Sequence, residues 1–270
     1  FLAYASYISP PEVNLPDNML LDFAALARNY QNPIYSDKNK KNQDYYKDLS
    51  KWLKVYDGDI SIYSYYRKYA WTSRPLIIPR FMQDEIKHYH SIGIKGISSY
   101  AEPGDWFTYG LNHYCLSNIA WDMDSDIDQL LEKYCRTCYQ KGSQQAKKVY
   151  NYLEPVSRIA SGIPHNDTLS VQEYEKHLEK LRSLRQETIS KADNYTSVTR
   201  SHLQKMGNML QYLIKDIELN RASAMGKPVK QRRSQVDAIR EFLLEYPNQG
   251  IFMLHFRLGS RLYRYYKCRN

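Results

Sequence analysis

Short apolar runs alternate with segments of helical spacing along residues 1–115, and this alternation constrains the fold more than any other feature of the sequence. Strand-like runs fall on residues 1–7, 18–26, 60–66 and 94–100, and helical spacing falls on residues 42–55 and 81–91. The run 18–26 fits a strand or a helix, and its shortness favours a strand. Strands that alternate with helices are typical of βα units and a parallel sheet. We therefore expect an α/β fold. A complete eight-unit barrel takes about 250 residues, so these runs supply half of one at most.

The chain beyond residue 105 is predicted to be helical. The acidic run around residues 122–128 does not fit a calcium loop, because Ile127 and Lys133 occupy the positions that need Gly and Glu. It reads instead as a helix start capped by Asp124 or Ser125. Three amphipathic stretches beyond residue 171 predict an antiparallel helical bundle or cap. The expected organisation is given by three ranges: 1–155 for the sheet with its flanking helices, 156–170 for a linker, and 171–270 for a basic helical region.

The charge is distributed unevenly along the chain. The formal net charge is +9, and Lys and Arg balance Asp and Glu over residues 1–170, so the whole excess falls on residues 171–270. Such an asymmetry indicates either an acidic partner or a set of solvated helix faces. Basic residues in 227–233, and arginines interleaved with aromatic residues after 255, could hold nucleic acid. No known nucleic-acid motif occurs, so nucleic acid is the less favoured partner.

Several function classes lack their sequence signals. Cys135 and Cys138 form a C-x-x-C late in a predicted helix, whereas a redox pair lies at a helix start and a zinc site needs a second pair. His88 and His90 are two residues apart and cannot share a helix face. No phosphate-binding loop and no G-x-S-x-G motif occurs, so we expect no metal and no cofactor. No apolar run approaches the roughly 20 residues of a membrane span, so we expect no membrane partner.

The strongest chemical signal is the run from Gly93 to Trp106, in which a predicted strand leads straight into a polar loop. Parallel α/β barrels present their chemistry at the C-terminal ends of their strands. Glu102 is the candidate catalytic carboxylate, as a general acid or as a ligand of a sugar hydroxyl. Hydrolysis by two carboxylates needs a partner about 5–10 Å away, for which Asp105 and Asp22 are the candidates. The alternative is an ordinary connecting loop whose carboxylate caps a turn.

Aromatic residues offer candidate platforms for sugar rings. The chain has 26 tyrosines, and tyrosine excess suits clefts and interfaces as well as cores. The candidate platforms are Tyr65, Tyr66, Trp71, Trp106 and Tyr109, with Tyr4 and Tyr7 at the end of the first strand-like run. For each of them, packing in the core is the alternative. Arg67 and Arg80 could bind a carboxylated sugar through bidentate contacts, although surface placement is favoured for both.

The order of several elements resembles one bacterial family. The matching elements are Trp52, the tyrosine-rich run 60–66, Pro75, Gly93-x-x-Gly96-Ile97, residues 109–116, and Trp121-Asp122-x-Asp124-x-Asp126 leading into Leu130-Leu131. The family is a domain of unknown function that forms the C-terminal half of glycoside-hydrolase-like barrel proteins, which are similar to hexosaminidase and α-glucuronidase barrels. The resemblance covers about residues 1–155.

This resemblance implies the second half of a (β/α)8 TIM-like barrel followed by helices, with carbohydrate as the ligand class. It also implies that a catalytic acidic pair lies upstream of Phe1 and that the remainder of the parent protein is a partner. Consistent with this, the chain begins without Met inside a strand-like run, so we expect a piece of a longer protein whose compartment the sequence does not reveal. The chain departs from the family's usual pattern at residues 100–104, which puts the role of Glu102 in doubt.

The sequence therefore favours a fragment of a glycoside-hydrolase-like protein that acts on or binds carbohydrate. Whether the fragment takes part in O-glycosyl hydrolysis stays open. The alternatives are a non-catalytic carbohydrate-binding or scaffold protein, and nucleic-acid binding through the basic helical region.

Overall fold

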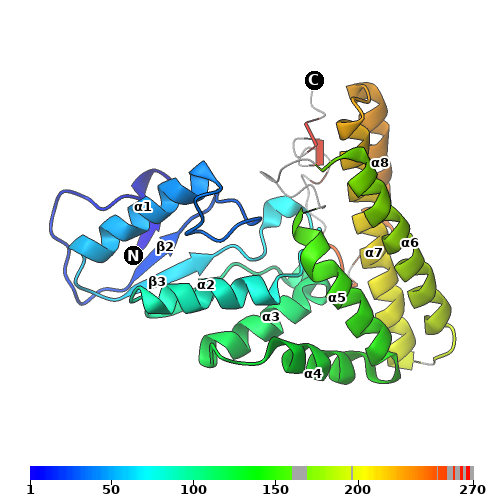
Figure 1. Cartoon of the computed structure of the whole chain (residues 1–270), viewed down its shortest axis with the longest axis horizontal. Helices are drawn as coiled ribbons and strands as arrows, with labels where there is room; N and C mark the ends of the chain where they lie inside the picture. Colours follow the sequence, from blue (N-terminus) through cyan, green and yellow to red (C-terminus); the bar gives the residue numbers. More distant parts are fainter. Residues whose placement is uncertain are drawn as a thin grey trace. The chain divides into compact units, whose positions relative to one another are not determined.

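A computed structural model describes residues 1–159, 169–195, 197–247 and 249–253, together with Leu258, Leu262, Tyr263, Tyr266 and Lys267. It divides into two compact units. The first unit comprises Phe1–Lys68, Pro79–Ala101 and Leu116–Ser125, and the second comprises Tyr69–Ile78, Glu102–Cys115 and Asp126–Asn270. The described residues thus form a mixed α/β structure with one parallel sheet and mostly helices (Figure 1).

The first unit is built on a four-stranded sheet. Its strands are β1 (Leu2–Tyr4), β2 (Leu21–Ala24), β3 (Ile60–Ser64) and β4 (Gly96–Ser99), in the order β1-β2-β3-β4. Every neighbouring pair is parallel, so the predicted parallel sheet is confirmed. The strands are shorter than the apolar runs. At β1 the reason is that residues Ala5–Tyr7 form a 3-10 helix, which begins with Ala5 at a φ of 49°.

Two helices cover one face of this sheet. They are α1 (Lys40–Val55) and α2 (Pro79–Ser91), close to the ranges that helical spacing predicts. Asn39 caps the start of α1, because its side chain accepts hydrogen bonds from two backbone amides of the first turn. The core joins the two helices to the sheet and includes Ala3, Leu21, Phe23, Ile60 and Ile62 from the strands with Leu49, Trp52 and Tyr89 from the helices. Because side chains alternate along a strand, all five strand residues belong to the same face.

The opposite face of the sheet is more open. Its first row across the strands consists of Leu2, Asp22, Ser61 and Gly96, which the register places side by side. Leu2 is 48% exposed and Gly96 is also exposed, whereas Ser61 is buried and its hydroxyl donates to Asp22. This face therefore carries polar groups and exposed positions that the other face lacks.

The second unit is helical. Helix α3 (Trp106–Trp121) begins in this unit and its residues after Cys115 belong to the first one. The others are α4 (Ile127–Tyr139), α5 (Ser143–Ile159), α6 (Val171–Ala192), α7 (Ser197–Ala224) and α8 (Val229–Leu244). The three helices predicted beyond residue 171 are confirmed as α6, α7 and α8. Short 3-10 helices occupy Tyr69–Trp71, Pro103–Asp105 and Gln140–Gly142.

Two boundary predictions have different outcomes. The predicted cap of α4 at Asp124 or Ser125 is wrong, because the carboxylate of Asp126 accepts the amides of Asp128 and Gln129. Several acidic residues stand close together there, and only the backbone path decides which of them can turn back onto the helix. The predicted linker 156–170 begins within α5, and its residues 160–168 lie outside the described part of the chain.

An ion pair lies at the centre of the second unit. Arg74 donates from Nε to Oδ1 of Asp216 at 2.8 Å, and neither side chain is exposed to solvent. The hydroxyl of Tyr266 also donates to this carboxylate, at 2.5 Å. Arg74 belongs to the segment Tyr69–Ile78, which follows β3 in the chain, so the pair fastens this segment to helix α7.

We predict that Asp216→Ala destabilises the protein by about 3–5 kcal/mol, because it leaves the Arg74 charge buried without its partner. Glu218, two residues along the same helix, pairs with Arg182 near the surface. Its replacement, Glu218→Ala, should cost about 1 kcal/mol or less. Urea denaturation of the two variants measures the contrast. Equal losses in the free energy of unfolding would show that the buried pair stabilises the fold no more than the surface pair does.

Candidate functional site

Tyrosines gather where the strands of the first unit end. Tyr63 lies in β3, Tyr65 follows that strand, and Tyr100 follows β4. The ring centroids of Tyr63 and Tyr65 are 5.3 Å apart, and those of Tyr65 and Tyr100 are 6.3 Å apart. All three side chains are half-buried, so part of each remains accessible. We call these three residues the tyrosine cluster. The carboxyl ends of parallel strands are where open and closed α/β sheets place their ligands.

The hydroxyl of Tyr65 is held in its neutral form. Burial raises its pKa, and the neighbouring tyrosines Tyr4 and Tyr63 add to the effect. The neutral phenol can both donate and accept a hydrogen bond at ordinary pH. The predicted platform residues Tyr65 and Tyr4 therefore lie within electrostatic reach of each other, whereas Tyr7 is 77% exposed.

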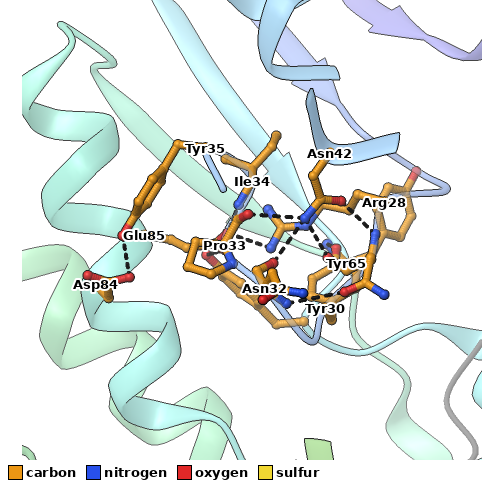
Figure 2. Close-up of polar contacts among 12 residues, drawn as sticks. Arg28, Tyr30, Asn32, Pro33, Ile34, Tyr35, Asn42, Tyr65, Asp84 and Glu85 are labelled. Atoms are coloured by element: carbon orange, nitrogen blue, oxygen red, sulfur yellow. Dashed lines mark hydrogen bonds and ion pairs between the residues drawn. The ribbon is translucent and has the colours of Figure 1, made fainter. Parts of the chain in front are cut away.

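The loop that follows β2 is fixed by a second buried ion pair. Arg28 donates from Nη2 to Oε1 of Glu85 on α2 at 2.5 Å, and both side chains are almost completely buried. The same Oε1 accepts the amide of Ile34 at 2.8 Å, and Oε2 accepts the hydroxyl of Tyr66 at 3.1 Å. Figure 2 shows Glu85 beside Ile34, whose backbone amide donates to its carboxylate. Burial raises the pKa of Glu85, while the charge of Arg28 opposes the shift.

A buried amide completes this loop. Asn42 accepts the amide of Asn29 through Oδ1 and donates through Nδ2 to the carbonyl oxygens of Asn29, Asn32 and Pro33 (Figure 2). Tyr30 from the same loop accepts the backbone amide of Tyr65 at 2.9 Å. The loop after β2 therefore fixes the backbone from which the Tyr65 ring projects.

Two cations follow Tyr65 in the chain, Arg67 and Lys68, and Arg67 lies 5.9 Å from the ring centroid of Tyr100. Sequence reasoning did not select Lys68. Its Nζ lies 5.9 Å from the ring centroid of Tyr65 and donates to the carbonyl oxygen of Leu26. Burial lowers the Lys68 pKa to about 8, and the positive charge of Lys41 contributes to the shift. The one sequence signal was its place four residues after the end of β3, where a parallel sheet places functional groups.

The predicted site residues fall into both units. Asp22, Tyr65 and Tyr66 belong to the first unit, and Trp71, Glu102, Asp105, Trp106 and Tyr109 belong to the second. In the first unit, Asp22 lies on the open face of the sheet, whereas the ring of Tyr66 is only 2% exposed inside the Arg28–Glu85 network. Arg67 is buried rather than on the surface, and Arg80 is exposed as expected.

In the second unit, Glu102 directly precedes the 3-10 helix Pro103–Asp105 and is half-buried, but its side chain does not cap that helix. Asp105 is fully buried and accepts the hydroxyl of Ser73 at 2.7 Å. Trp106 is 55% exposed and stacks on His113 with ring centroids 4.6 Å apart. The remaining two aromatic candidates, Trp71 and Tyr109, are buried.

Other chemistry has little support in the described residues. They contain no group of three or more His, Cys, Asp or Glu side chains placed to hold a metal ion. Burial raises the pKa of Cys135 to about 12, which keeps this thiol protonated. No helix in the described ranges is long and apolar enough for a membrane span.

In the basic region, Arg232 donates to the carbonyl oxygens of Lys227 and Tyr266, while the arginines at 257, 261, 264 and 269 lie outside the described residues.

Comparison with known protein families finds a match over more than half of the chain. A family described as a domain of unknown function, DUF4838, matches residues 1–154. The chain belongs to the DUF4838 family. The DUF4838 match spans all four strands and the helices from α1 through most of α5, so it contains the tyrosine cluster and Glu102. No curated protein and no solved structure matches the chain.

Lys68 should make the stability of the protein depend on pH. Folding lowers its pKa from an ordinary value of 10.5 to about 8, so the unfolded chain holds the extra proton between these values and stability rises as the pH increases through 8. Between pH 7 and 9 we expect the wild type to gain about 1 kcal/mol relative to Lys68→Met. Urea denaturation of both proteins at both pH values measures this gain. Parallel pH curves for the two proteins would contradict it.

Proposed function

We propose that the DUF4838 part of this chain forms the C-terminal half of a TIM-like barrel in a glycoside-hydrolase-like protein, and that the carboxyl ends of its strands bind carbohydrate. The strand order supports the half-barrel. Four parallel strands lie side by side in chain order, and α1 and α2 cross over on the same face. Successive βα units with this arrangement are the repeating element of the barrel.

The open face of the sheet supports a partner for this half. Parallel sheets occur almost only with both faces covered. Here α1 and α2 cover one face, while Leu2 and Gly96 remain exposed on the other. In a closed barrel that face becomes the interior, where Asp22 and Ser61 would be enclosed. The proposed partner is the remainder of the parent protein, which supplies the other strands.

The tyrosine cluster is the observation that carries the carbohydrate proposal. Its three rings lie within 5.3–6.3 Å of a neighbour at the ends of β3 and β4. Flat rings cover the apolar faces of pyranoses, and neutral phenols exchange hydrogen bonds with sugar hydroxyls. The Arg28–Glu85 pair and Asn42 hold the adjoining loop rigidly, so little conformational entropy is lost when a ligand binds.

A second candidate is carbohydrate binding without hydrolysis. The tyrosine cluster offers rings and hydroxyls but no carboxylate, so it can bind a sugar without providing the acid that cleaves one. In the hydrolytic version of the proposal, Glu102 acts as general acid or holds a sugar hydroxyl, after the last strand of the sheet.

We predict that Tyr65→Ala weakens binding of a pyranose oligosaccharide about three- to tenfold, because one ring face is lost. Tyr152→Ala is the matched control, since Tyr152 is likewise half-buried but lies on helix α5 of the second unit, where its hydroxyl contacts His177. A panel of immobilised oligosaccharides selects the ligand, and titration calorimetry measures both variants. Equal affinities of Tyr65→Ala and wild type would refute the role of the cluster.

We predict that Glu102→Gln in the full-length parent protein lowers the hydrolytic rate about 10²–10⁴-fold, as expected for loss of a general acid. Binding of the same oligosaccharide should change much less. A variant that binds sugar and hydrolyses it at the wild-type rate would exclude Glu102 as the acid. If the wild-type parent binds oligosaccharides and hydrolyses none, the non-catalytic candidate is the correct one.

A further inference from the structure

We propose that Lys68 forms an anion-binding site at the carboxyl end of β3, which takes a carboxylate, sulfate or phosphate group of the ligand. The inference rests on the proposed carbohydrate function where the anion is part of a saccharide, and it adds an acidic substituent to that ligand class. A free inorganic oxyanion would offer the same chemistry, and the experiment separates the two sources.

Among the described residues, the amine of Lys68 is hydrogen-bonded to a backbone carbonyl oxygen and is not paired with a carboxylate. Its side chain is partly buried, and its Nζ donates to the carbonyl oxygen of Leu26. Across the part of the chain that the structure describes, no carboxylate forms an ion pair with Lys68. An ammonium group carries three donors, so further hydrogen bonds to a ligand remain available beside the one to Leu26.

The surroundings of Lys68 disfavour its positive charge, so a bound anion would stabilise it. Burial disfavours the charged amine, and the charge of Lys41 at the start of α1 disfavours it further. Even so, a pKa of about 8 leaves the amine mostly protonated at neutral pH. Buried charges are normally paired, and a ligand anion would offset both the desolvation and the repulsion between the lysines.

The position of Lys68 indicates that a ligand bound to its amine also contacts the tyrosine cluster. The amine lies 5.9 Å from the centroid of the Tyr65 ring, so a group bound to it has the tyrosine cluster as its neighbour. The titratable groups that raise the pKa of Tyr65 are Tyr4, Tyr30, Tyr45 and Tyr63, and the permanently charged Arg67 lies 5.9 Å from the ring centroid of Tyr100. Burial raises the pKa of Tyr65 and moves that of Tyr30 to about 12. A binding step near pH 8 is therefore assigned to Lys68 rather than to these two phenols.

The test uses the full chain with three probes: inorganic sulfate, an oligogalacturonate, and the same oligosaccharide with its carboxylates methyl-esterified. Lysines are labelled by reductive ¹³C-methylation, and Lys68→Met identifies the signal of Lys68. Lys54→Met is the matched control, because Lys54 lies exposed near the other end of α1. Since Lys68→Met removes a partly buried charge, its fold is checked by urea denaturation before binding is measured.

We expect sulfate to raise the pKa of Lys68, and the acidic oligosaccharide to bind about 10- to 100-fold more tightly than its ester, as one charge-assisted hydrogen bond predicts. Lys68→Met should abolish this preference and Lys54→Met should keep it. The affinity of the wild type for the acid should fall about tenfold between pH 7 and 9.5, because Lys68 loses its proton.

The outcomes separate the two proposals. If acid and ester bind equally and sulfate leaves the Lys68 signal unchanged, the anion site is overturned and carbohydrate binding stands. If sulfate raises the pKa of Lys68 but neither oligosaccharide binds, the anion site stands with a free oxyanion as its ligand. The proposed carbohydrate function is then contradicted for these sugars. If Lys68→Met binds the acid as well as the wild type does, the assignment to Lys68 is overturned.

Discussion

The ion pair between Arg28 and Glu85 is the contact on which the strand-end region of the first unit depends. It joins the loop after β2 to helix α2, and it does so at a position that water does not reach. Such a pair contributes modestly to stability when complete, yet each charge would be very costly alone. The additional donors, the amide of Ile34 and the hydroxyl of Tyr66, are therefore essential, since they satisfy both carboxylate oxygens. The result is a single arrangement of the loop from which Tyr30 positions Tyr65.

The sheet explains why a rigid strand-end region and an open face occur together. Helices α1 and α2 bury one face in an apolar core, and the loops that emerge from the carboxyl ends are fixed by polar contacts above it. The second face keeps Asp22 and Ser61 hydrogen-bonded to each other while Leu2 stays exposed. The proposed half-barrel requires a sheet with these two faces, because in a closed barrel the polar face would become the interior.

Local patterns in the sequence predicted much of the fold. Apolar runs located all four strands, and helical spacing located α1, α2 and the three helices after residue 171, because burial of one face leaves a periodic record in the sequence. The polar contacts left no such record. Arg28 and Glu85 are 57 residues apart, and no local rule pairs them. Tyr66 and Trp71 had the composition of platform residues, yet their rings are buried. Lys68 was overlooked because its burial arises from the loop after β2, a contact 42 residues away.

The backbone at Thr72 and Ser73 stores strain that contacts within the second unit hold in place. Both residues adopt positive φ, at 53° and 63°, a conformation that costs on the order of 1–3 kcal/mol for residues other than glycine. The cost is sustained because Arg74 is tied to Asp216 and Ser73 to Asp105. All four residues belong to the second unit, so the strain and the contacts that hold it lie within one folded unit. Loss of either contact would let Thr72 and Ser73 return to ordinary backbone conformations, and the energy they store would then favour opening of this segment.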